Sequence, residues 1–363
     1  MATRRQFLAG TASAALAAGL SCRPSFAAGF TVPEIDRLSL QVLLDSSHDI
    51  FLGPDKVAGV EITRARSATF PKILHNQWGL SLFIESQKGN DIRNVMLDFG
   101  YSPEALLNNI DILGVDPKKL HALIVSHGHY DHFGGLMGFL QKYRDALPSD
   151  ITLYTGGEHV FCHRYNRTPT QGQFTDFGVL NRKEIAEKRL NLKMADQPMV
   201  LDAHAFSTGP IKRSGFERVL PNTMVEYKIE NGVGCDATKF NAADKAGQIV
   251  PDEHEHEHAT CFNLKGKGLV VITSCGHAGI INTIRQAQEV SGVNKLFALV
   301  GGFHLGPAKP DYAAQSVAAL KELGPQVVVP MHCSGVNFIQ EVRKQMPERM
   351  LLSTTGSRVT FSA

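Results

Sequence analysis

Apolar runs with the length of buried strands recur along the chain, and several of them end in histidine, cysteine and glycine. Residues 120–125 form one such run, rich in branched side chains, and a polar stretch with three histidines follows it. The pattern returns later, where strands are predicted at 269–275, 295–300 and 326–331 and helices at 280–291, 310–323 and 337–346. Alternating strands and helices with polar side chains at strand ends predict an α/β layer architecture.

The first half of the chain contains further elements of the same predicted domain. A helix is predicted over 103–113, with Ser102 as its N-cap, Pro103 at its first position and Gly114 as its stop. A second helix is predicted over 136–147. Further strands are predicted at 38–44, 79–85, 94–100, 151–154 and 259–264.

Residues 159–251 have a less regular pattern that polar clusters interrupt. The predicted elements here are a charged helix near 182–192 and strands near 199–201 and 224–227. Several polar side chains are interpreted as solvated loop residues, namely His159, His163 and Arg164. We therefore expect a single domain over 28–363, in which 159–251 is an insertion above the active site.

The first 27 residues have the pattern of an export signal. Arg4 and Arg5 precede an apolar, alanine-rich stretch at 9–20, and the small residues Ser25 and Ala27 permit cleavage after Ala27. The paired arginines indicate the twin-arginine translocation machinery as a partner and the periplasm as destination. A permanent membrane anchor is disfavoured, because the apolar stretch is short and is interrupted by glycine, serine and threonine.

Composition narrows the function only slightly. The chain has 363 residues, 43% of them hydrophobic and 20% charged, with a net charge of +2. It contains no block of basic residues of the kind that would predict nucleic-acid binding. Of six cysteines, Cys22 would leave with the signal, and an odd number remains. This count argues against a full disulfide framework, although an oxidising compartment permits one or two bridges that spacing cannot assign. The oligomeric state is not predicted.

The most informative stretch lies at 126–135, where His127, His129, Asp131 and His132 offer four metal donors within six residues. In an extended backbone the first three would point to one side, with His132 following at a turn. The two glycines at 134 and 135 would let the backbone approach a bound group. Imidazole and carboxylate donors suit zinc, manganese or iron, and four donors can serve two ions. A surface histidine-rich turn is the alternative, which the preceding buried strand disfavours.

A second unusual stretch lies at 252–258, where acidic residues alternate strictly with histidines. As a strand it would present histidines on one face and carboxylates on the other. Two interpretations remain open: a flexible polar loop, or a role at the mouth of the active site.

The H-x-H-x-D-H run resembles the metallo-β-lactamase superfamily, whose members hold two metal ions at the edge of an αββα sandwich. Further motifs resemble the branch named after 7,8-dihydropterin-6-methyl-4-(β-D-ribofuranosyl)aminobenzene-5'-phosphate synthase. These are WGLS at 78–81, LDFG at 97–100, SCGHAGIIN at 274–282, GGFHL at 301–305 and HCSG at 332–335.

The resemblance implies a set of ligands for two divalent ions, with zinc expected and manganese or iron compatible. One ion would be held by His127, His129 and His277, and the other by Asp131, His132 and His332. Cys275 stands where many relatives have a bridging aspartate, and it is either a ligand or a packed core thiol. Asp98 would orient a ligand histidine from behind. His304 would contact the substrate or support the ligands.

The resemblance also implies metal-assisted hydrolysis of a small-molecule ester, lactone or phosphoester. Asp131 would orient the attacking water, and His304 would donate a proton to the leaving group. Two alternatives stay open: a non-catalytic, metal-dependent binding or sensing protein, and a pterin-related synthase. An exported protein fits the synthase poorly, because it would be separated from cytoplasmic pterin biosynthesis.

Overall fold

The computed structural model describes residues 31–65, 71–239 and 245–363. The export signal expected at 1–27 therefore lies outside the described residues. Within the described ranges, no helix is both long enough and apolar enough to cross a membrane.

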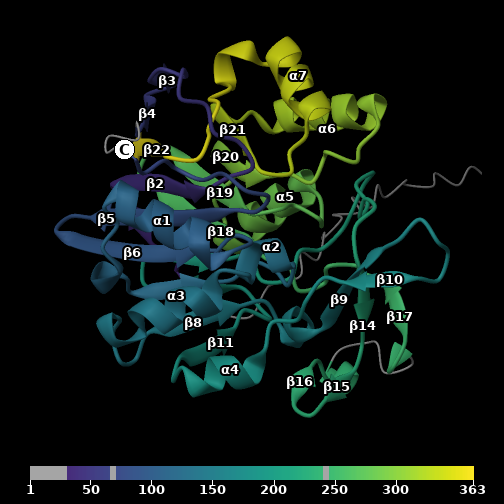
Figure 1. The fold of residues 1–363 in the computed structure, drawn as a ribbon. Coiled ribbons are helices and arrows are strands. Elements are labelled where there is room, and N and C mark those ends of the chain that lie inside the picture. The colour runs from purple at the N-terminus through teal and green to yellow at the C-terminus, as the bar shows by residue number, and fades with distance from the viewer. Residues whose placement is uncertain (1–30, 66–70, 240–244) are drawn as a thin grey trace, which may run out of the picture.

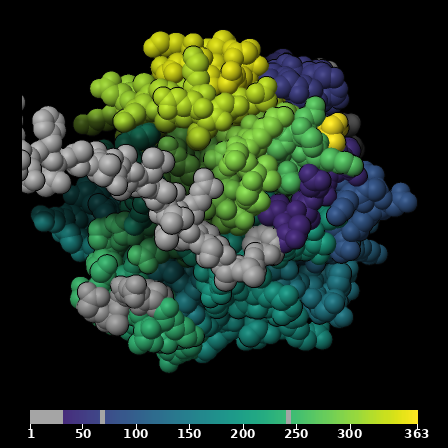
Figure 2. All heavy atoms as spheres, turned by 180° about the vertical axis from the view of Figure 1, so that it is seen from behind, coloured from purple at the N-terminus to yellow at the C-terminus, as the bar shows by residue number. Residues whose placement is uncertain are grey.

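Two β-sheets pack face to face, and helices cover their outer faces (Figure 1). The first sheet has the strand order β11 (Asn191–Met194), β8 (Thr152–Thr155), β7 (Ala122–Ile124), β6 (Asp91–Leu97), β5 (Ser81–Lys88), β2 (Arg37–Leu44), β22 (Ser357–Ser362), β4 (Val60–Arg64) and β3 (Asp55–Val57). The second has the order β12 (Met199–Leu201), β13 (Ala205–Ser207), β18 (Thr260–Leu264), β19 (Gly268–Thr273), β20 (Leu296–Gly302) and β21 (Val327–Met331). The short strand β1 (Glu34–Ile35) pairs with β18, so the start of the described chain lies against the second sheet (Figure 2).

The helices divide between the two sheets. The first sheet carries α1 (Pro103–Leu113) and α3 (Leu136–Tyr143), and the second carries α5 (Ile280–Ser291), α6 (Pro310–Leu323) and α7 (Val336–Gln345). Side chains alternate between layers, so that Ile124 packs between the sheets while Leu123 packs beneath α1 and α3. The predicted αββα sandwich is confirmed.

Most predicted elements are present, with corrections at their ends. The helices α5 and α6 have the predicted bounds, and α1 ends at Gly114 in the left-handed conformation. Ser102 occupies the N-cap of α1, but its side chain makes no capping hydrogen bond. The predicted helix at 136–147 ends as an α-helix at Tyr143 and continues as one 3₁₀ turn.

The charged helix predicted near 182–192 is shorter in the structure than predicted. It ends as α4 (Arg182–Glu187), because the chain turns at Arg189, which has a φ of 53°, and then forms β11. Strand β11 pairs in parallel with β8 at the edge of the first sheet. Strand pairing therefore prevails over local helical preference here.

Part of the irregular region forms a small sheet of its own at the side of the sandwich (Figure 1), while β11, β12 and β13 from the same region extend the two main sheets. Its strands are β10 (Phe174–Asp176), β9 (His163–Arg167), β14 (Met224–Glu226) and β17 (Ile249–Pro251), with a short hairpin of β15 (Ile229–Glu230) and β16 (Val233–Gly234) nearby. A disulfide joins Cys162 to Cys235.

The interpretation of His159 and Arg164 as solvated loop residues is wrong. Arg164 is 0% exposed, and its guanidinium donates to Asp252 Oδ2 at 2.7 Å and to the carbonyl oxygens of Val160 and Cys162. His159 is buried as well, whereas His163 is partly exposed and contacts Asp176. Arg164 can be buried because its charge is neutralised by Asp252 and its donors are hydrogen-bonded.

Candidate metal centre

The first metal loop joins β7 to a single helical turn, α2 (Tyr130–Phe133). The backbone is extended at His129, with φ −81° and ψ 139°, but Asp131 already belongs to α2. The prediction that His127, His129 and Asp131 alternate along an extended segment is therefore wrong beyond His129. The helical turn instead places Asp131 and His132 together at the end of the loop.

The role predicted for Gly134 and Gly135 also needs correction. A Cβ atom at Gly134 would lie 2.1 Å from the carbonyl oxygen of Tyr101, and one at Gly135 would lie 2.2 Å from that of Phe99. Both contacts are far too short. The glycines therefore permit close packing of the loop against the segment after β6, rather than an approach to a bound group.

His127, His129 and His277 form the first cluster of donors. Each offers a ring nitrogen, and these atoms lie within 4.8 Å of one another in buried surroundings. His127 Nε2 and both ring nitrogens of His277 have no hydrogen-bond partner among the described residues. Buried polar atoms normally have partners, so these nitrogens are free to bind a metal ion.

The protonation states of this cluster also suit a metal. Burial, and then the neighbouring His132, lowers the pKa of His127 well below its usual value. Burial, and then His254, does the same for the pKa of His277. Both imidazoles are therefore neutral near pH 7, which is the form that binds metals.

Asp131, His132 and His332 form the second cluster. His332 Nε2 lies 3.2 Å from His132 Nε2 and 3.3 Å from Asp131 Oδ2, and Asp131 Oδ1 has no partner among the described residues. Burial opposes ionisation of Asp131, but His132 and His332 outweigh it and lower the pKa of the carboxyl. An ionised carboxylate and two histidine rings thus face one point, which suits a divalent ion. Burial lowers the pKa of His332, but Cys333 and Asp131 outweigh it and raise this pKa well above its usual value, so a bound ion would displace a proton from this ring.

Two buried carboxylates contact histidines of the second cluster on the side away from the proposed metal ion. Asp98 Oδ2 lies 2.7 Å from His132 Nδ1, and the same carboxylate accepts hydrogen bonds from the backbone and side chain of Ser126. Asp45, which directly follows β2, accepts from the backbone nitrogen of His332 at 2.6 Å. Such partners fix the orientation of ligand histidines. Asp45 was missed in the sequence, where its only signal is its place at a strand end.

Cys275 lies between the two clusters. Its sulfur is within 4.8 Å of ring nitrogens of His127 and His132, and it lies at hydrogen-bonding distance, 3.1 Å, from Cys333 Sγ, without a disulfide between the two cysteines. This position permits a bridging ligand and also permits a packed thiol, so the role of Cys275 remains a prediction. Cys333 was quoted in a motif but given no role, and its sulfur accepts from the backbone nitrogen of His304 at 3.1 Å.

The alternating segment at 252–258 is neither a strand nor a flexible loop. It forms a buried turn, in which the ring of His254 stacks on that of His277 with centroids 3.8 Å apart and an interplanar angle of 6°. Neither ring nitrogen of His254 has a hydrogen-bond partner within the described ranges, and this histidine is a further donor that was missed. Glu257 accepts from the backbone nitrogens of His277 and Ala278, which positions the third ligand of the first cluster.

The clusters open into a pocket of about 140 Å³. Asp131, His304 and His332 line it, and Trp78 and Phe177 form apolar parts of its wall. Thr223 also lines the pocket, and its hydroxyl lies 2.9 Å from His129 Nε2. All the predicted site residues therefore lie around one pocket or directly behind it. Unpaired buried nitrogens and an unpaired carboxylate oxygen show that the donor set fits divalent metal ions.

An αββα sandwich with these donors at its strand ends defines a metallo-β-lactamase-type protein. The family model described as the metallo-β-lactamase superfamily matches residues 79–152, and the chain belongs to this superfamily.

The relatives place the chain within the superfamily. It is 30% identical over 288 residues to the 7,8-dihydropterin-6-methyl-4-(β-D-ribofuranosyl)-aminobenzene-5'-phosphate synthase of Methanocaldococcus jannaschii, covering 76% of this chain and 88% of the relative. The uncharacterized protein MJ0448 of the same organism is 25% identical over 266 residues, covering 73% and 87%. The crystal structure of Tm1679, a metal-dependent hydrolase of the β-lactamase superfamily, shares the fold with a TM-score of 0.64 at 22% identity, covering 90% of this chain and 100% of that chain.

Proposed function

We propose that this protein is a metallohydrolase that cleaves a small-molecule ester, lactone or phosphoester. The observation that carries the proposal is the pair of buried donor clusters, which share one pocket with the unpaired carboxylate oxygen of Asp131. Two divalent ions fit these donors, with zinc expected and manganese or iron compatible. When bound, such an ion would lower the pKa of water to near neutrality and so supply a nucleophile.

The residues of the chain have separate roles in this reaction. Asp131 would accept a hydrogen bond from the attacking water and so orient it. His304 lines the pocket, with its ring close to that of His277 at a centroid distance of 4.0 Å, and would donate a proton to the leaving oxygen. Trp78 and Phe177 would limit the access of bulk water to the reacting bond.

A pterin-related synthase is the second candidate, and the 30% identity to a protein of that name favours it. A metal-dependent binding protein without turnover is the third. Both alternatives would use the same metal ligands, so the three candidates are distinguished by which reaction, if any, the protein catalyses.

The test is turnover by residues 28–363 loaded with zinc, manganese or iron, assayed on p-nitrophenyl esters, lactones and phosphodiesters. We expect hydrolysis of at least one class and about two ions per chain by elemental analysis. His132→Ala should lower metal content and abolish turnover, whereas His163→Ala, outside the clusters, should change neither. Full metal content without hydrolysis would contradict the proposal, and formation of the relative's named product would favour the synthase.

We also propose export to the periplasm through the twin-arginine machinery, on the strength of the first 27 residues. Lysine at both Arg4 and Arg5 should leave the protein in the cytoplasm with its signal uncleaved. Cell fractionation and the mass of the recovered chain measure both effects. Normal periplasmic accumulation of the double variant would contradict this route.

A further inference from the structure

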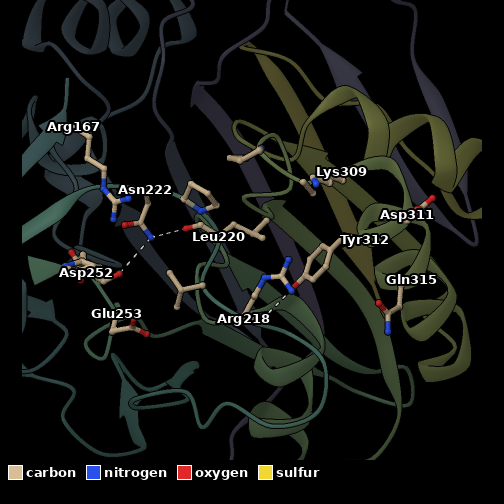
Figure 3. Close-up of a pocket in the computed structure, with 15 residues that line it drawn as sticks. Arg167, Arg218, Leu220, Asn222, Asp252, Glu253, Lys309, Asp311, Tyr312 and Gln315 are labelled. Atoms are coloured by element: carbon tan, nitrogen blue, oxygen red, sulfur yellow. Dashed lines mark hydrogen bonds between the residues drawn. The ribbon is translucent and has the colours of Figure 1, made fainter. Parts of the chain in front are cut away.

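A second cavity, of about 620 Å³, shares the lining residue Asn222 with the metal pocket. Figure 3 shows the residues that line this cavity. The wall between them is formed by residues 220–223. Asn222 lines both spaces, while Pro221 lines the cavity and its carbonyl oxygen lies 3.3 Å from His304 Nε2. On the same wall Thr223 contacts His129. A molecule in the cavity is therefore separated from the proposed catalytic groups by one segment of chain.

The sizes of the two spaces indicate how a substrate would be divided between them. The metal pocket measures about 140 Å³, which is smaller than the roughly 300–1,000 Å³ of a typical small-molecule site. With ions and a water molecule bound, the pocket has room for the reacting bond and little else. The rest of a substrate must lie outside, and the shared residue Asn222 leads toward the larger cavity.

Three cationic side chains line this cavity. Arg167 comes from β9, Arg218 from the loop before Leu220, and Lys309 from the N-cap of α6 (Figure 3). None of the three has an ion-pair partner in the part of the chain that the structure describes. The guanidinium of Arg218 instead lies over the ring of Tyr312, 5.2 Å from its centroid.

The carboxylates of the cavity do not compensate these charges. Asp252 is paired with Arg164, and Glu253 with Arg213, at 2.7 and 3.2 Å. Both of these arginines lie outside the cavity lining. Asp311 is the remaining carboxylate of the lining, so three cations face one unpaired acid. The lining therefore has more unpaired cationic side chains than unpaired acidic ones, although all three cations are exposed to solvent.

We infer that this cavity binds an anionic group of the substrate, a phosphate or carboxylate remote from the bond that is cleaved. The inference rests on the proposed hydrolase function and narrows its substrates to anionic small molecules. The guanidinium groups of Arg167 and Arg218 offer paired donors that match an oxyanion, and Lys309 adds a point charge. Tyr312 holds Arg218 in place, because its ring lies under the guanidinium and its hydroxyl accepts from the Arg218 backbone nitrogen at 3.2 Å.

The test compares p-nitrophenyl butyrate with the p-nitrophenyl monoester of glutaric acid, whose far end carries a carboxylate. In metal-loaded protein, Arg218→Gln should raise KM for the anionic ester about tenfold, with kcat unchanged and KM for butyrate changed less than about twofold. Arg167→Gln should act in the same direction. Lys321→Gln, at the other end of α6, is the matched control and should change neither substrate.

A second readout does not depend on turnover. Calorimetric titration with inorganic phosphate should show about tenfold weaker binding to Arg218→Gln than to wild type and to Lys321→Gln. If neither ester is hydrolysed, the hydrolase proposal is decided by the wider substrate panel described above, and phosphate binding alone decides the role of the cavity. Equal changes of KM for both esters, or an unchanged phosphate affinity where there is no turnover, would overturn the inference.

Discussion

Asp252→Ala should lower the free energy of unfolding by about 3–5 kcal/mol, because it leaves the buried guanidinium of Arg164 without a counter-charge. Both side chains are 0% exposed, and they are joined at 2.7 Å. Burial opposes ionisation of Asp252, yet His254 and Arg164 outweigh it and hold the pKa of this carboxyl well below its usual value. The variant would therefore bury a charge that the native protein neutralises.

Urea denaturation of metal-depleted protein measures this effect, because metal removal excludes changes in metal affinity from the result. Glu253→Ala is the matched control: it removes the neighbouring carboxylate, whose pair with Arg213 is partly exposed on both sides, and should cost less than about 1 kcal/mol. Equal losses of unfolding free energy in the two variants would show that the Arg164–Asp252 pair stabilises the protein no more than an exposed ion pair does.

His277→Ala should remove about one metal ion per chain and weaken the remaining metal binding at least about 100-fold. Loss of a residue that only hydrogen-bonds to a metal ligand usually weakens metal binding less than this. His277 is one of three neutral imidazoles in the first cluster, and Glu257 fixes its backbone. Elemental analysis and competition with a chromophoric chelator measure the loss. Turnover should be lost with the ion.

Cys275→Ser distinguishes the two interpretations left open for Cys275. A thiolate ligand would give a sulfur-to-metal charge-transfer band in cobalt-substituted protein, and serine would erase it and weaken metal binding. A packed thiol would give no band, and serine would cost only a little stability. Full metal content in His277→Ala together with metal loss in Cys275→Ser would reverse the assignment of this pair.

Local signals explain why much of the sandwich could be predicted from the sequence. The helices α5 and α6 end at Gly292 and Gly324 in the left-handed conformation, and α6 begins with Pro310. Glycine and proline fix such ends through their own backbone preferences, independently of the rest of the fold. The buried strands β19 and β20 were predicted for a similar reason, since continuous apolar runs need no knowledge of their partners.

The residues that were missed depend on contacts between distant segments. Asp45 meets His332 across 287 positions of sequence, and Thr223 meets His129 across 94. Arg164 is buried through Asp252, which lies 88 positions away. No apolar period marks these residues: Asp45 and Thr223 were assigned no role, and the polar character of Arg164 predicted exposure. The alternating acids and histidines near His254 were noticed, but only the fold shows that this turn is buried.

Strand β22 lies between β2 and β4 inside the first sheet, and the side chain of Gln41 bonds to the backbone of Ser357 across 316 positions. During synthesis, β2 can pair with β5 early, but more than 300 residues must follow β2 before its second neighbour, β22, has been made. Until then β2 presents an open edge, and the β3–β4 hairpin has no strand to join it to the sheet. Such distant pairing makes folding slow and leaves the growing chain dependent on protection from aggregation.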